Sequence, residues 1–284
     1  MQEHLTGKQR VYFAPDNNLS DIAIEYLNDG QQTFFEKYEV YRLSSTKELC
    51  RDYSETTCEK SITIFGDIDY NTELVAAKRG GTLSFGKLKY GREEIDGIKS
   101  FVAKSYKTNV YDGKKATEKL FRELSNKNPM ILHISSHGEY NGDDKINETD
   151  AMVNSLLALS GANADSDDIL NDGIITAADI AQMNLRQCDM AVLSACNTGI
   201  GGKGTDGIFG LQRGFKNAGV HSLLMSLKPV YDESTAKLMI AFYQGLAQGK
   251  SKRQSLLDAQ KHIRSIGYTE GKYWAPFILL DGIK

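Results

Sequence analysis

The chain has 284 residues, with 34 Lys and Arg against 37 Asp and Glu, and a formal net charge of −3 at pH 7. It contains no block of basic residues, no apolar run near the roughly 20 residues that cross a bilayer, and no signal-peptide pattern at its start. Its four cysteines, Cys50, Cys58, Cys188 and Cys196, form no CxxC pair, which is typical of a reducing compartment. We therefore expect a cytoplasmic protein with neither a nucleic-acid nor a membrane partner.

Short apolar runs alternate with helical patterns along the chain. Two predicted strands, 10–14 and 38–43, lie in the first 60 residues, and no boundary in composition follows. The later predicted strands lie at 61–65, 109–111, 130–136, 190–195, 220–227 and 275–280, with a hairpin at 152–160 and 173–176 and a polar loop at 139–150. Helices are predicted at 91–105, from 116 to before Pro129, from Thr176 through 183, before Gly219, from Asp232 to Gly249, and at 251–265.

Strands separated by helices imply right-handed βαβ crossovers and an α/β fold with a mostly parallel sheet. We expect one domain over residues 1–284, in which 61–284 is the catalytic core and 1–60 is an add-on or an edge of the same domain. The strand at 275–280 is expected at an edge of the sheet, where it would pair with a second copy of the chain.

Two predicted strands end in residues that carry chemistry, namely His137-Gly138 and Cys196. In an open α/β sheet, the functional crevice lies beyond the carboxyl ends of the strands. If these strands are neighbours, the imidazole accepts the proton of the thiol and makes it a nucleophile. The N–H groups of Gly138 and Cys196 would then bind an oxyanion, and Gly138 has no Cβ to keep a substrate away.

The same residue types also have ordinary structural roles. A cysteine in a buried strand is more often a small core residue, and we assign that role to the other three cysteines. The histidines assigned to the fold are His4, His133, His221 and His262. His133 and His137 are four residues apart and suggest a metal pair, but no further ligand stands at zinc spacing. The pattern alone leaves both the catalytic and the structural interpretation open.

Residues 202–207, Gly-Lys-Gly-Thr-Asp-Gly, fit the GxGxxG pattern of a dinucleotide site between a strand and a helix. However, the next predicted strand is followed by Lys228-Pro229 instead of the acid that would hold a ribose, and the motif lies too late for a first βα turn. A glycine-rich loop beside an active site is the favoured interpretation, and a dinucleotide-binding oxidoreductase is the weaker alternative.

Together these segments resemble the CHAT domain family, a bacterial branch of the caspase-like cysteine peptidases of clan CD that also resembles separase. The segments that carry the resemblance follow in order at 11–16 (VYFAPD), 65–70 (FGDIDY), 132–138 (LHISSHG), 192–199 (VLSACNTG), 207–219, 232–245 and 273–282 (YWAPFILLDG). The resemblance implies a caspase-hemoglobinase-like three-layer α/β sandwich, with a mostly parallel central sheet and helices on both faces.

By this resemblance His137 is the base, Cys196 is the nucleophile, and the N–H groups of Gly138 and Cys196 hold the oxyanion. Such an enzyme forms and hydrolyses a thioester with no metal or organic cofactor. Relatives cut a specific protein target, often in bacterial defence systems, which implies a protein substrate and control by a repeat or sensor domain or a separate protein. The alternative function is a catalytically silent scaffold that keeps the fold and binds a partner protein.

Three further residues are expected to contact the substrate by the same resemblance. Asp67 and Asp69 follow the strand at 61–65, beside the primary pocket of this architecture. A carboxylate there would favour Arg or Lys before the cut through charge-assisted hydrogen bonds, whereas the alternative is that Asp67 only caps the turn. Lys228 stands where the family often has an aromatic residue, in a loop that lines the cleft, so the subsite preferences of this chain are open.

Overall fold

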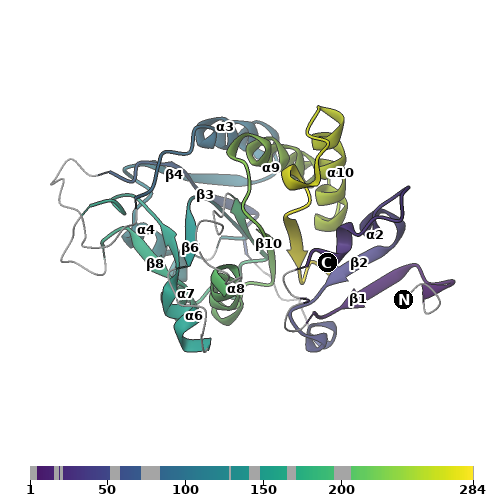
Figure 1. Cartoon of the computed structure of the whole chain (residues 1–284). Coiled ribbons are helices and arrows are strands. Elements are labelled where there is room, and N and C mark those ends of the chain that lie inside the picture. The colour runs from purple at the N-terminus through teal and green to yellow at the C-terminus, as the bar shows by residue number, and fades with distance from the viewer. Residues whose placement is uncertain are drawn as a thin grey trace.

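The computed structural model describes residues 5–15, 19, 22–51, 58–71, 84–127, 129–140, 148–164, 171–194 and 206–283. The strands of its main sheet are β1 (Arg10–Phe13), β2 (Glu39–Arg42), β3 (Ser61–Ile68), β4 (Lys107–Gly113), β5 (Ile131–Ser135), β9 (Met190–Ser194), β10 (Ser222–Ser226) and β11 (Phe277–Leu280). They lie in the order β1-β2-β11-β10-β9-β5-β3-β4 (Figure 1). Neighbouring strands are parallel except β10 and β11, which confirms the predicted mostly parallel sheet.

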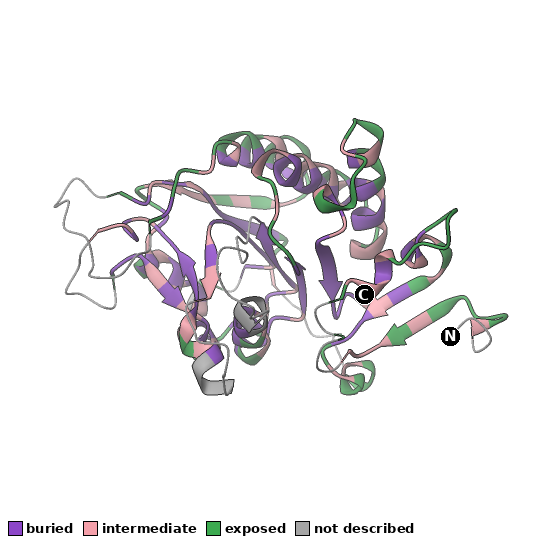
Figure 2. Cartoon of the chain, in the orientation of Figure 1, coloured by how far each residue is buried: buried purple, intermediate pink, exposed green. Residues whose placement is uncertain are grey.

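Helices cover both faces of this sheet, as predicted (Figure 1). One face carries α3 (Gly91–Val102), α9 (Asp232–Ala247) and α10 (Lys252–Ser265), and the other carries α4 (Glu118–Arg122), α7 (Ala177–Ala181) and α8 (Asp206–Ala218). Successive side chains of a strand point to opposite faces. In β9, Met190 and Val192 belong to the core on the side of α3, α9 and α10, whereas Ala191 and Leu193 belong to the core on the side of α4, α7 and α8. Both faces of the central strands are therefore buried, as Figure 2 shows.

Side-chain caps fix where several of these helices begin. The Thr176 hydroxyl accepts the N–H of Asp179, whose carboxylate in turn accepts the N–H of Thr176, so a capping box begins α7 at the predicted residue. The helix predicted before Pro129 is instead divided into α4 and α5 (Leu124–Lys127), because the chain turns at Glu123. Of the helices in the described ranges, none has both the length and the apolar character to cross a membrane.

A second, smaller sheet contains β6 (Gly138–Tyr140), β7 (Ser155–Ala158) and β8 (Ile174–Thr176), all antiparallel. Strands β7 and β8 confirm the predicted hairpin. The predicted loop at 139–150 is wrong at both ends, where β6 and helix α6 (Glu148–Asn154) stand. Strand β6 is polar and short, and it exists because its backbone pairs with β7, which no local pattern announces.

Strand β11 lies inside the main sheet, between β10 and β2, so the prediction that it forms an edge is wrong. Its run Phe-Ile-Leu-Leu is apolar at every position, and all four residues are buried, because both of its faces are covered by helices and both of its edges are paired. The edge strands are β1 and β4, and β1 is exposed or half-buried along its length.

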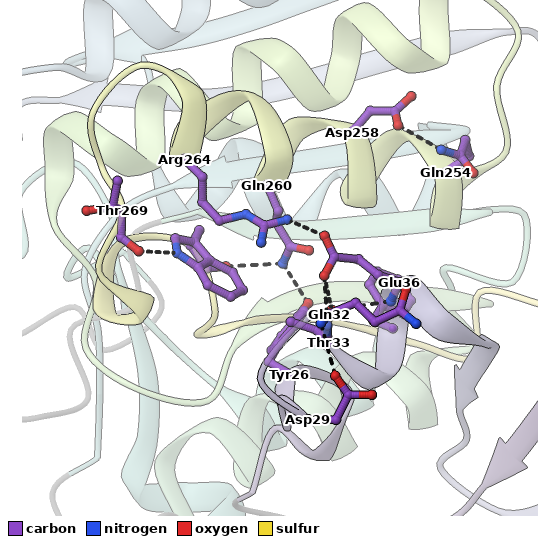
Figure 3. A network of polar contacts seen from close by, with 12 residues as sticks. Tyr26, Asp29, Gln32, Thr33, Glu36, Gln254, Asp258, Gln260, Arg264 and Thr269 are labelled. Atoms are coloured by element: carbon purple, nitrogen blue, oxygen red, sulfur yellow. Dashed lines mark hydrogen bonds and ion pairs between the residues drawn. The ribbon is translucent and has the colours of Figure 1, made fainter.

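The segment before β2 is fixed to α10 by a network of polar contacts (Figure 3). The amide of Gln260 donates to the Tyr26 hydroxyl at 2.6 Å, and the guanidinium of Arg264 binds the Glu36 carboxylate at 2.6 Å. Close by, the buried guanidinium of Arg42 binds the Glu25 carboxylate at 2.7 Å. These contacts explain why β1 and β2 stay on the same sheet as the remaining strands.

Candidate active site

The strands that precede the two predicted catalytic residues are direct neighbours. Strands β5 and β9 are parallel and in register, with Ser135 opposite Ser194 at their carboxyl ends. His137 comes two residues after Ser135, and Cys196 comes two residues after Ser194 in the sequence. Cys196 itself, with its N–H group, lies outside the described residues, as do residues 199–205 of the glycine-rich stretch.

Among the described residues, one hydrogen bond and two aromatic neighbours hold the ring of His137. Its Nε2 atom lies 2.6 Å from the carbonyl oxygen of Gly86. Because a carbonyl only accepts, Nε2 carries the proton, and in the neutral ring Nδ1 is then the nitrogen that can take up a proton. The rings of Tyr70 and Phe85 lie with their centroids 5.2 Å and 5.6 Å from that of the imidazole.

The segment that carries Phe85 and Gly86 is held in turn by one side chain, that of Asn163. Its Oδ1 accepts the N–H of Phe85 at 2.8 Å, and its Nδ2 donates to the carbonyl of Phe85 at 2.9 Å. The backbone N–H of Asn163 also donates to the carbonyl of Tyr70 at 2.9 Å. Asn163 therefore connects both aromatic neighbours of His137, and sequence analysis missed it because a single Asn in a loop carries no distinctive pattern.

The chain on either side of His137 is fixed from below by β7. The N–H of Ala158 donates to the carbonyl of His137 at 2.9 Å, and the Ser136 hydroxyl donates to the carbonyl of Ala158. Burial raises the pKa of Tyr70 to about 12, so its hydroxyl stays protonated 3.2 Å from that of Ser136. Gly138 is buried at the start of β6, opposite Leu157.

Asp67 already has cationic partners within the chain. Its carboxylate lies 2.8 Å from Arg92 and 3.2 Å from Lys87, and Arg92 also binds Asp112 at 2.7 Å. Asp67 is one of two described non-glycine residues with a positive φ, 48°, and it lies at an irregularity within β3, where the register with β4 shifts between Gly66 and Ile68. Its described partners are these side chains and not the turn backbone.

Asp69 and Lys228, like His137, lie beyond the carboxyl ends of parallel strands of the main sheet. Asp69 follows the end of β3, and its Oδ1 accepts the N–H of Asn71 at 3.1 Å. Lys228 is exposed and follows β10 by two residues. The structure thus brings Asp67 together with basic side chains of its own chain, and it leaves Asp69 and Lys228 outside that cluster.

His133 points into the interior of the protein, away from the site. It is fully buried, and its Nδ1 lies 3.2 Å from the hydroxyl of Tyr243 on α9. Within the described ranges, no group of three or more His, Cys, Asp or Glu side chains is arranged to hold a metal ion. The two histidines therefore do not share one site.

Comparisons of the sequence with known proteins point to one family. The model of the CHAT domain matches residues 1–282. Tetratricopeptide repeat protein 28 of Mus musculus is 31% identical over 112 residues, which make up 39% of this chain and 4% of that protein. The Homo sapiens protein of the same name is 30% identical over 112 residues, with the same two shares. The chain thus corresponds to only a small part of these curated relatives.

Comparisons of the structure point to cysteine proteinases. The crystal structure of gingipain R, an Arg-specific cysteine proteinase, matches with a TM-score of 0.58 at 10% identity, over 98% of this chain and 65% of that chain. A complex of pro- and mature domains from Porphyromonas gingivalis matches with a TM-score of 0.56 at 9% identity, over 98% and 66%. At such identities the likeness shows a shared fold.

Proposed function

Because the chain belongs to the CHAT domain family and has the fold of cysteine proteinases, we propose that it is a cysteine endopeptidase with His137 as base and Cys196 as nucleophile. The observation that carries the proposal is the register of β5 and β9. Each of the two residues follows a matched strand end by two positions, on parallel neighbouring strands. Equal offsets from one register pair favour close approach of the thiol and the imidazole.

The contacts of His137 fit the role of a base. With its Nε2 proton donated to Gly86, the ring takes the thiol proton of Cys196 on Nδ1. The thiolate then attacks the scissile carbonyl, and the N–H groups of Gly138 and Cys196 stabilise the oxyanion. The intermediate collapses to a thioester as the imidazolium returns its proton to the leaving amine. Water, deprotonated by the same ring, then releases the acid product and the free thiol.

For the primary pocket we propose Asp69 as the carboxylate that selects Arg or Lys, with Lys228 on the opposite rim. The ion pairs of Asp67 with Lys87 and Arg92 support this choice, because a substrate cation would have to displace both. A buried or half-buried carboxylate binds a guanidinium through strong, charge-assisted hydrogen bonds. Asp67 would then hold the end of β3 against α3.

The proposed setting is a bacterial defence or signalling system in the cytoplasm, with one protein as the target. Cys50, Cys58 and Cys188 are free thiols, which fits a reducing compartment. The partial matches to tetratricopeptide repeat proteins support control by a repeat domain or a partner protein. In this proposal residues 1–284 form one peptidase domain, with its catalytic core in 61–284.

Selective alkylation of thiols tests the dyad without knowledge of the target. We expect iodoacetamide to modify Cys196 faster than the exposed Cys50, and His137→Ala to slow that reaction by at least about tenfold, because less thiolate is present. The matched control is His262→Ala, which removes an exposed histidine from α10. If Cys196 reacts no faster than Cys50, the chain is a scaffold that keeps the fold. If Cys196 does react selectively, capture of the target with a Cys196→Ala variant identifies the substrate.

A further inference from the structure

A carboxylate lies buried beside the carboxyl end of β5, the strand that precedes His137. It belongs to Glu94 in the first turn of α3 and is 2% exposed. The Ser135 hydroxyl donates to its Oε2 at 2.7 Å, and the Ser194 hydroxyl donates to its Oε1 at 2.6 Å. These serines are the last residues of β5 and β9 and stand opposite each other in the sheet. One side chain therefore joins the ends of both strands.

A third contact comes from His133, which points to the same face of β5 as Ser135. Its Nε2 lies 3.2 Å from Oε1 of Glu94, without the alignment of a hydrogen bond. Burial alone would raise the pKa of Glu94, but its contacts with His133, Ser194 and Ser135 outweigh burial and lower that pKa. The carboxylate is therefore ionised, and both of its oxygens act as acceptors.

An ionised carboxylate in the interior is costly unless it is fully hydrogen-bonded. Apolar side chains at these three positions would fill the same space between α3 and the sheet with less desolvation. Strand pairing does not need the carboxylate either, because backbone hydrogen bonds already join β5 and β9. The charge lies at the ends of the two strands that precede the proposed dyad. This position suggests that the carboxylate serves the dyad and not the stability of the fold.

We infer that Glu94 is a positioning residue that sets the separation of His137 and Cys196 by holding Ser135 and Ser194 together. The inference rests on the proposed function. Each serine precedes its dyad member by only two residues in the sequence, so a shift at the serines moves the dyad directly. Proton transfer needs the two groups within hydrogen-bond reach, and a displacement of about 1 Å can slow catalysis roughly 100-fold.

The last described hydrogen bond between the two strands gives a readout that does not depend on catalysis. The N–H of Ser136 donates to the carbonyl of Ser194 at 3.3 Å, one residue beyond the serine pair. This bond is long, so its protection from hydrogen exchange depends on how firmly the strand ends are held. If the hydrogen bonds of Glu94 with Ser135 and Ser194 are lost, this amide exchanges before those of the rest of the sheet.

The test compares Glu94→Gln, Ser135→Ala and Ser194→Ala with wild type. Each variant has a side chain of similar or smaller size and weakens the hydrogen bonds between Glu94 and the two serines. We expect faster hydrogen exchange at the Ser136 amide and alkylation of Cys196 that is about 10- to 100-fold slower. We also expect the pH midpoint of alkylation to move up toward the ordinary thiol value of about 8.5. A change confined to stability would leave that midpoint where it is.

The matched control is Ser222→Ala, at the opposite end of the sheet. The Ser222 hydroxyl is fully buried and donates to the carbonyl of Asp189 at 2.8 Å, so its loss also removes one buried hydrogen bond. It should change neither the Ser136 exchange rate nor the pH midpoint. If Glu94→Gln does not fold, the two single serine variants carry the same comparison.

Three results would overturn the inference. The first is a hydrogen-exchange rate at the Ser136 amide that is the same in Glu94→Gln, Ser135→Ala and Ser194→Ala as in wild type. The second is faster exchange with unchanged rate and pH midpoint of Cys196 alkylation, which would make Glu94 structural. The third is a wild-type Cys196 that reacts no faster than Cys50, which removes the proposed function and the positioning role with it. In that last case the exchange data still report whether Glu94 holds the strands, so the two failures are distinguishable.

Discussion

The Nε2 atom of His137 lies 2.6 Å from the carbonyl oxygen of Gly86, a residue 51 positions earlier in the chain. The group that orients the ring is part of the backbone, so the side chain at position 86 takes no part in the contact. The direction of the imidazole therefore depends on the path of the backbone at residues 85 and 86. Asn163 holds that path through both polar groups of Phe85.

Removal of the Asn163 amide should disorganise the site. Asn163→Ala leaves the N–H and carbonyl of Phe85 without their side-chain partner, so we expect a loss of about 1–3 kcal/mol in the free energy of unfolding and slower alkylation of Cys196. Asn163→Asp keeps the shape but cannot donate to the carbonyl of Phe85, so it should slow alkylation as well. Urea titration and iodoacetamide labelling measure the two effects. The control is Asn109→Ala on the exposed edge strand β4.

Two alanine substitutions at glycines near the site should have opposite outcomes. A Cβ on Gly86 meets no atom within 4 Å, so Gly86→Ala should keep the alkylation rate of Cys196 and change stability by less than about 0.5 kcal/mol. A Cβ on Gly91 would lie 3.0 Å from the backbone N and Cα of Asp67. Gly91→Ala should therefore destabilise the protein by about 1–3 kcal/mol, although Ala favours helices. Equal stability of the two variants in urea would contradict this account of α3 packing.

Peptides that differ only in the residue before the cut distinguish the two acidic candidates. We expect Asp69→Asn to reduce cleavage after Arg and Lys by at least about tenfold relative to cleavage after Leu, because a charge-assisted hydrogen bond is lost. Asp67→Asn should leave that ratio unchanged, since the Asp67 carboxylate is occupied by Lys87 and Arg92. Equal cleavage after Leu and Arg by the wild-type enzyme would remove the acidic pocket altogether.

The two ion pairs of the N-terminal strands should differ widely in their contribution to stability. Glu25→Ala leaves the guanidinium of Arg42, 3% exposed, without its carboxylate, and should cost about 3–5 kcal/mol. Glu39→Ala breaks the exposed pair with Arg10 and should cost less than about 1 kcal/mol. Unfolding of both variants in urea gives the comparison, and similar costs would mean that burial is not what makes the first pair important.

Acid should weaken the contact between α10 and the segment before β2. Burial tends to raise the pKa of Glu36, but its hydrogen bonds with Thr33 and Arg264 lower it from 4.5 to about 2. A carboxyl with a lowered folded-state pKa stabilises the protein above its unfolded pKa, and this contribution is lost as pH falls toward 2. The free energy of unfolding should therefore fall less steeply below about pH 4.5 in Glu36→Gln than in wild type. Parallel curves for the two proteins would contradict this contribution.

The regular elements were predictable where burial repeats along the chain. The central strands are apolar runs because helices cover both of their faces, and the order of strands and helices follows from that pattern. Strand β6 was not predictable, since it depends on its pairing with β7. The internal place of β11 was not predictable either, because strand order is set by contacts between distant segments.

For the candidate site, the sequence pattern predicted His137 and Cys196, which stay predictions, but it did not reveal the residues that contact His137 and the two strand ends. Glu94 had a detectable signal, because it lies on the same helical stripe as the buried Ile98 and Val102. An acidic residue in a first helical turn is common, however, and that obscured it. Gly86 acts through its carbonyl, which every residue type has, so no residue pattern reveals it.

Strand β11 has a consequence for how the molecule is made. Strands β1 and β2 are synthesised well before β11, the described strand that joins them to the remaining sheet. At about 5–20 residues per second, β2 waits roughly 12 to 50 s for this partner. From its own synthesis until β11 follows, β10 offers an open edge to any neighbouring polypeptide, so this late stage of translation is the one that favours wrong strand pairing.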